Sequence, residues 1–85
     1  MVREYNIGVA AVFHVHGYEP VGQECREGRV AFLFPDAHAE HLTALRQQFY
    51  GGTLAVTAVN YNSALRMYSM RLRSALNGRF AGGAQ

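Results

Sequence analysis

The segment from Arg29 to Phe34, which reads Arg-Val-Ala-Phe-Leu-Phe, constrains the fold of this chain more than any other feature. Side chains alternate between the two faces of a strand. One face would carry Val30, Phe32 and Phe34, and the other Ala31 and Leu33. Because both faces are apolar, both need cover inside the protein or at an interface. We therefore predict a strand here, and an interface with a second copy or another protein at these five residues.

A second strand is predicted just before it, from Glu19 to Arg26. Pro20 lies at its beginning, where a missing backbone donor does least harm. Gly28 can supply the positive φ of a tight turn, so Glu27-Gly28 is predicted to join the two strands in a hairpin. An isolated two-stranded hairpin is marginal in water. We therefore expect a third strand or a second copy of the domain, and a homo-oligomer, most simply a dimer.

The first segment is compatible with either strand or helix on propensity alone. A helical stripe is formed by Val9, Val12, Phe13 and His16, at positions i, i+3, i+4 and i+7, and Gly17 follows where a helix commonly ends. We predict a helix over residues 6–16.

Two helices are predicted after the hairpin. Asp36 is suited to cap the first, whose apolar residues are Leu42, Leu45 and Phe49, and Gly51-Gly52 would end it. Residues 53–56 form a short extended connection or a third strand. Thr57 would cap the last helix, whose stripe is Tyr61, Leu65, Tyr68, Leu72 and Leu76, with Asn77-Gly78 as its stop.

These elements predict an α+β fold: an N-terminal helix, an antiparallel hairpin, then two helices. Eighty-five residues suit one domain, expected over 1–78, with a flexible tail at 79–85. No apolar run reaches the roughly 18–20 residues of a membrane span, and the start is too polar for a secretory signal, so we expect a cytoplasmic protein.

Charge is distributed unevenly along the chain. All six acids lie in residues 1–40 with three arginines, which gives that part a net charge of −3. The other five arginines lie in residues 41–85 without any acid, which gives +5. The basic residues 41–85 can therefore bind an anionic surface or interact with the acidic residues 1–40 of the same chain.

The last predicted helix carries the strongest functional signal. Arg66 and Arg73 are seven residues apart and share one side, with Arg71 on a flank. If the Tyr/Leu stripe is buried, these guanidinium groups face solvent, where they pair readily with phosphate oxygens. We predict nucleic-acid contacts at Arg46, Arg66, Arg71 and Arg73. A solvated helix face without a ligand is the alternative, and a protein-interaction module is the alternative function.

Other candidate chemistry is weaker. His38 and His41 are spaced i, i+3, and the pair His14 and His16 would diverge on a helix. With Cys25 or Glu40 they suggest a zinc or nickel site, but ordinary solvated histidines explain the pattern. Cys25 is the only cysteine, so no intrachain disulfide can form. Since neither a catalytic constellation nor a phosphate-binding loop is present, we expect no enzyme activity, no metal and no cofactor.

Several short motifs follow in a recognisable order. They are Asn6 to Ala11 before Gly17-Tyr18, Pro20 to Gly22, Arg29 to Asp36, Phe49 to Gly52, and Tyr61-x-x-Ala64-Leu65. Over residues 4–76 this order resembles a small family of bacterial and phage domains of unknown function. The resemblance implies the order helix, hairpin, helix, helix and carries no activity. The chain departs from the family pattern at Asn6, where an acid is usual, and at His14 and His16.

Overall fold

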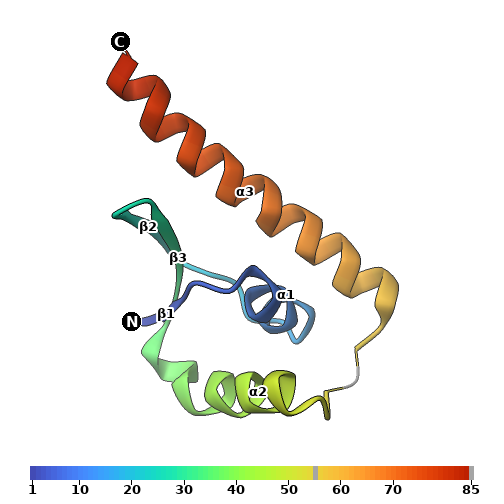
Figure 1. The fold of residues 1–85 in the computed structure, drawn as a ribbon. Helices are drawn as coiled ribbons and strands as arrows, with labels where there is room; N and C mark the ends of the chain where they lie inside the picture. Colours follow the sequence, from blue (N-terminus) through green and yellow to red (C-terminus); the bar gives the residue numbers. More distant parts are fainter. Residues whose placement is uncertain (55, 85) are drawn as a thin grey trace.

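The computed structural model describes residues 1–54 and 56–84, and the side chains of all of these except 78–84. Its elements are β1 (Val2–Glu4), α1 (Ile7–Val15), β2 (Gly22–Arg26), β3 (Arg29–Phe34), the 3-10 turn η1 (Asp36–His38), α2 (Ala39–Gly51) and α3 (Ala58–Ala84). The predicted α+β class is confirmed, with one antiparallel sheet beside three helices (Figure 1).

The sheet has the strand order β1-β3-β2, so β3 lies in the middle. The predicted hairpin is confirmed, although its first strand begins at Gly22 and not at Glu19: β2 and β3 are antiparallel, and Arg26 pairs with Arg29 across the turn. Glu27 and Gly28 both have positive φ, 53° and 77°. This combination matches the right-handed twist of paired strands and gives the tightest hairpin connection.

The third strand comes from the N-terminus, where the sequence analysis predicted none. In β1, Val2 pairs with Phe34 and Glu4 with Phe32. Residues 53–56, which were predicted as either a short extended connection or a third strand, do not supply it. Among those that the structure describes, Thr53, Leu54 and Val56 lie in no strand. Ala55 lies outside the described residues. A sheet that gains its third strand within the chain does not need a second copy to complete it.

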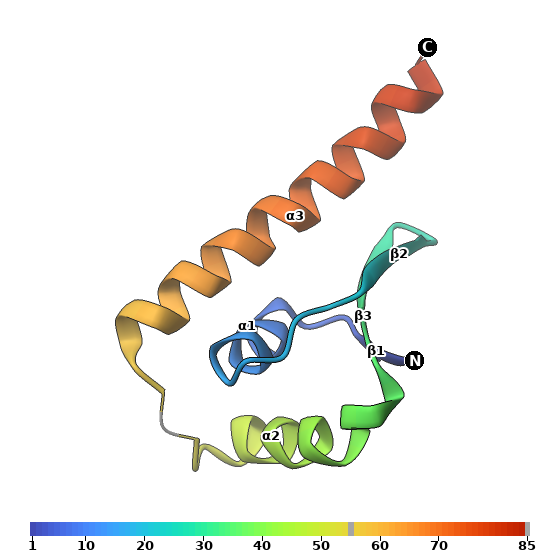
Figure 2. The ribbon, with the colours of Figure 1, turned by 180° about the vertical axis from the view of Figure 1, so that it is seen from behind.

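α1 is the central helix of the fold and confirms the prediction for residues 6–16. Asn6 caps it, since its side-chain oxygen accepts a hydrogen bond from the Gly8 amide at 2.8 Å. All six residues from Gly8 to Phe13 are buried. In both views α1 lies between α2 and α3 (Figures 1 and 2), which explains why it is apolar on every side and not along a narrow stripe.

α2 begins three residues later than its predicted cap. Asp36 opens the turn η1 and makes no capping hydrogen bond to α2, which begins at Ala39. Its carboxylate instead lies 2.7 Å from the amino nitrogen of Met1. The predicted end is confirmed, because Gly52 adopts the left-handed conformation with φ 72° directly after the helix.

α3 begins after Thr57, as predicted, but the stop predicted at Asn77-Gly78 is wrong. The backbone stays helical as far as Ala84. At 1.5 Å per residue its 27 residues span about 40 Å, nearly the longest dimension of the molecule, 45 Å. The C-terminal half of α3 therefore extends beyond the rest of the domain (Figure 2). The flexible tail was predicted for residues 79–85. The side chains of residues 79–84 and the whole of residue 85 lie outside the described part.

The core lies between β3 and the three helices. The Phe13 ring meets Phe34 edge-on at 5.1 Å between centroids, and Tyr68 of α3 meets Phe32 at 4.9 Å. Edge-to-face packing of this kind adds to the free energy gained by burying the rings. The Val30, Phe32 and Phe34 face is thus covered by helices of the same chain.

The opposite face of β3 is covered by polar side chains of the neighbouring segments. Arg3 of β1 and Glu24 of β2 form an ion pair of 3.5 Å across the central strand. The Arg29 guanidinium stacks 4.3 Å from the centre of the Tyr5 ring. Ala31 is only 1% exposed as a result. No helix in the described part of the chain is both long and apolar enough to span a membrane.

Candidate nucleic-acid interface

α3 presents two different faces, as its sequence period predicts. Tyr68 and Ala64 are buried against α1 and the sheet, and Tyr61, Leu65, Leu72 and Leu76 pack around them. Arg66 and Arg73 share one side of the helix, because seven residues make nearly two full turns. That side lies almost opposite the buried Tyr68. Both are exposed, and neither forms an ion pair or a ring contact with another described side chain. Among the arginines of α3 whose side chains the structure describes, they are the two most available to a ligand.

Arg71 lies on the inner flank of α3. Its guanidinium carbon is 5.5 Å from the centre of the Tyr68 ring. It also lines a groove of about 290 Å³ between α3 and the β2 edge, together with Pro20, Val21, Gly22, Gln23 and Phe32. This arginine therefore faces the sheet, and not the side that Arg66 and Arg73 share.

Tyr68, whose ring lies under the Arg71 guanidinium, carries a buried hydroxyl. The hydroxyl has no hydrogen-bond partner among the described residues. Burial raises the pKa of Tyr68 above its usual value of 10.0, Arg71 partly offsets that effect, and Glu19 adds to it. The phenol is thus held in its neutral form.

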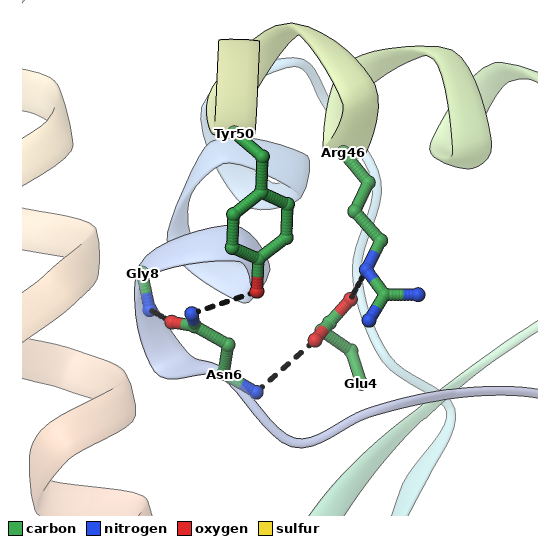
Figure 3. Close-up of polar contacts among 5 residues, drawn as sticks. All are labelled: Glu4, Asn6, Gly8, Arg46 and Tyr50. Carbon is green, nitrogen blue, oxygen red and sulfur yellow. Dashed lines mark hydrogen bonds and ion pairs between the residues drawn. The ribbon is translucent and has the colours of Figure 1, made fainter. Parts of the chain in front are cut away.

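Arg46 does not join the arginines of α3. It lies on α2, and its Nε is 3.4 Å from a carboxylate oxygen of Glu4 (Figure 3). Glu4 is 3% exposed, so the guanidinium neutralises a carboxylate that is nearly removed from water. The structure therefore gives Arg46 a role in holding α2 to the start of the chain.

The same cluster fixes the beginning of α1. Besides capping α1, Asn6 donates a hydrogen bond from its backbone amide to the second carboxylate oxygen of Glu4, at 3.1 Å. Its side-chain amide donates to the Tyr50 hydroxyl at 3.0 Å (Figure 3). Tyr50 is 60% exposed, and its ring centre is 5.8 Å from the Arg46 guanidinium. Residues of β1, α1 and α2 are thus joined by one polar network.

Gly8 of α1 lies close to side chains of both α2 and α3. A Cβ atom there would lie 3.1 Å from the Asn6 side-chain oxygen and 3.2 Å from both the Phe49 ring and the Tyr61 hydroxyl. These distances are tighter than ordinary van der Waals contacts. A methyl group at this position would therefore crowd the packing of α2 and α3 against α1, and these side chains would have to shift by a few tenths of an ångström to admit it.

The histidines are dispersed over two regions. The Tyr18 hydroxyl lies 3.1 Å from Nδ1 of His41, and its ring packs 5.0 Å from His38. His14 lies 4.0 Å from Glu19, whereas His16 Nδ1 bonds the Val12 carbonyl oxygen at 2.9 Å. Among the described residues no three His, Cys, Asp or Glu side chains are grouped so that they could hold a metal ion.

The predicted apolar interface lies largely inside the domain. Four of its five residues are buried, namely Val30, Ala31, Phe32 and Phe34. Leu33 is partly exposed and pairs with both Arg3 and Gly22. Any surface that this hairpin offers to a partner must therefore come mainly from its edge.

Sequence reasoning missed the importance of Glu4, Asn6 and Gly8. Asn6 directly precedes an apolar helix, and asparagine is a favoured N-cap residue. This local signal could have predicted its capping role. Nothing local indicates that Glu4 meets Arg46, because the two are separated by 41 residues. Comparison of the chain with protein-family models, with curated proteins and with solved structures found no match.

Proposed function

We propose that this chain is a non-enzymatic nucleic-acid-binding domain whose α3 contacts the phosphate backbone. The observation that carries the proposal is the outward pair Arg66 and Arg73, exposed on a projecting helix without a carboxylate partner in the described part of the chain. Guanidinium groups pair with phosphate oxygens in a two-bond geometry. A polyanion is the ligand class that such a face binds best.

The surroundings of the pair support this ligand class. No acidic residue occurs anywhere from residue 41 to residue 85, so α3 carries no negative charge that would repel phosphates. The acids of the chain lie outside α3, and three of them already have a cationic partner: Glu4 with Arg46, Glu24 with Arg3, and Asp36 with the amino group of Met1. The positive field of α3 is therefore left largely uncompensated.

The predicted binding is independent of base sequence. Between and beside the two arginines lie Asn62, Met70 and Asn77, all of them exposed. Phosphate contacts set register and orientation but carry no base information. We assign the contacts to Arg66 and Arg73. Arg71 faces the groove and Arg46 is engaged with Glu4, so both contribute to the local field without direct contact.

The experiment measures binding to labelled single- and double-stranded oligonucleotides by fluorescence anisotropy over a salt series. The Arg66→Gln/Arg73→Gln variant is compared with Arg3→Gln/Arg29→Gln, which loses the same charge from the solvent face of the sheet. Each lost phosphate contact lowers the magnitude of the log–log salt slope by about 1. We expect a loss of about two from the α3 variant and a much smaller change from the sheet variant. Equal effects of the two variants would refute the assignment to α3.

A further inference from the structure

The groove between α3 and β2 is a concave site that the nucleic-acid proposal leaves unused. Its volume of about 290 Å³ equals that of roughly ten water molecules. This places it just below the range of ordinary small-molecule sites. The described residues that line it come from the segment before β2, from both strands of the hairpin and from α3. Segments that are distant in the sequence therefore meet around one small space.

The apolar part of the groove lies on the packed core. Phe32 of β3 lines the groove and is only 1% exposed, and the Tyr68 ring meets it edge-on at 4.9 Å. Pro20 and Val21 add apolar atoms at the side, and Val21 is 60% exposed. A ligand that covers Val21 removes apolar surface from water, which is favourable. The groove is thus suited to a short apolar group.

Two polar side chains line the same groove, Arg71 of α3 and Gln23 of β2. Gln23 is the cross-strand partner of Phe32, so both point to the same face of the sheet. Among the described residues, neither Arg71 nor Gln23 makes a side-chain hydrogen bond or an ion pair. The Arg71 guanidinium only lies over the Tyr68 ring, which occupies none of its hydrogen-bond donors. Its donors and the Gln23 amide are therefore available to a ligand.

The charge of the groove selects the kind of ligand. Arg71 is cationic, and no carboxylate is among the described lining residues. Glu19 precedes the groove in the sequence, but its carboxylate lies 4.0 Å from Nδ1 of His14 and does not line the groove. A guanidinium binds a carboxylate through two parallel hydrogen bonds. A ligand with a single negative charge therefore matches this site.

We propose that the groove binds a small monocarboxylate with a short apolar body, the carboxylate on Arg71 and Gln23 and the body against Phe32. A phosphate fits less well, because its greater charge and strong hydration would have to be given up beside apolar walls. An uncharged ligand would leave the guanidinium donors unpaired. Arg66 and Arg73 do not line the groove, so this proposal and the nucleic-acid proposal do not depend on each other.

The test is a heteronuclear NMR titration of the isotope-labelled chain with phenylacetate at neutral pH. Phenylacetamide is the matched ligand, because it has nearly the same shape and no charge. We expect phenylacetate to cause saturable shifts at the backbone amides of Val21, Gly22 and Gln23. Phenylacetamide is expected to bind about tenfold more weakly or less, since hydrogen bonds between charged groups are the stronger ones.

Variants from both sides of the groove locate the carboxylate. Arg71→Gln is expected to weaken phenylacetate binding about tenfold or more. Arg26→Gln is its matched control: it removes the same charge from an exposed residue of β2, three positions from Gln23 and hence on the other face of the sheet. Val21→Glu places a carboxylate beside Arg71 and is expected to abolish binding. Val21→Gln, which has the same size without the charge, is expected to weaken it much less.

Circular dichroism verifies that each variant is folded. Because Val21 is exposed, the two Val21 variants decide the matter even if Arg71→Gln does not fold. Phenylacetate that shifts no amide of the groove at millimolar concentrations would overturn the proposal. So would equal binding of phenylacetate and phenylacetamide, equal effects of Arg71→Gln and Arg26→Gln, or equal effects of Val21→Glu and Val21→Gln.

Discussion

Replacement of Asn6 tests how the start of the fold is held together. Asn6 caps α1 through the Gly8 amide at 2.8 Å, and it donates to the Tyr50 hydroxyl at 3.0 Å. Loss of an N-cap side chain costs about 1 kcal/mol, and the exposed hydrogen bond adds about 0.5 kcal/mol. We therefore expect Asn6→Ala to lower the free energy of unfolding by about 1.5 kcal/mol.

The measurement is urea denaturation followed by circular dichroism, together with a thermal melt. For a domain of this size about 1.5 kcal/mol corresponds to a Tm roughly 6–12 °C lower. Asn62→Ala is the matched control, because Asn62 is exposed within α3 and alanine is the better helix former there. Tyr50→Phe removes only the hydroxyl contact and should cost about 0.5 kcal/mol. In the Asn6→Ala background it should cost nothing further.

The result that would refute this reasoning is specific. If Asn6→Ala is no less stable than Asn62→Ala, the capping interaction does not contribute to folding. If Tyr50→Phe costs as much in the Asn6→Ala background as in the parent, the two residues are not coupled. Both outcomes can be read from one set of five denaturation curves: the parent, the three single variants and the Asn6→Ala/Tyr50→Phe double variant.

Three further predictions follow from the packing. Gly8→Ala should destabilise the protein by about 1–2 kcal/mol in urea denaturation despite the better helix propensity of alanine, because the new methyl group is crowded by Phe49 and Tyr61. Tyr68→Phe should leave the free energy of unfolding unchanged or raise it by up to about 1 kcal/mol at pH 7, since the hydroxyl is buried without a partner among the described residues. Because the pKa of Tyr68 is raised in the folded state, the native protein retains a proton that the unfolded chain loses at high pH. The free energy of unfolding should therefore fall as the pH rises above about 10. The fall should be smaller in Tyr68→Phe.

The hairpin could be predicted from sequence because its signals are local. Glu27-Gly28 and the apolar run after it decide turn and register without reference to the rest of the chain. β1 could not be predicted, since three residues are too few for an alternating pattern and the strand exists only because β3 is beside it. The end of α3 was mispredicted because a glycine inside a helix costs only about 1 kcal/mol. That cost does not by itself stop a helix.

The candidate site was predictable to the extent that it follows helical period. The seven-residue spacing of Arg66 and Arg73 was enough to place both on the outer side of α3. The environments of Arg46 and Arg71 were not predictable, because their neighbours come from distant parts of the chain. Arg46 meets Glu4 of β1, and Arg71 meets the groove beside β2. Only the tertiary structure separates these two arginines from the outward pair.

The most direct test of the central claim is the salt dependence of oligonucleotide binding by the parent chain. If α3 binds phosphates, the affinity should fall steeply with salt, with a log–log slope of several units, for single- and double-stranded oligonucleotides of any sequence. The Arg66→Gln/Arg73→Gln variant should reduce that slope by about two. Absence of binding at low salt, or a slope that the variant leaves unchanged, would contradict the assignment of α3 as a nucleic-acid interface.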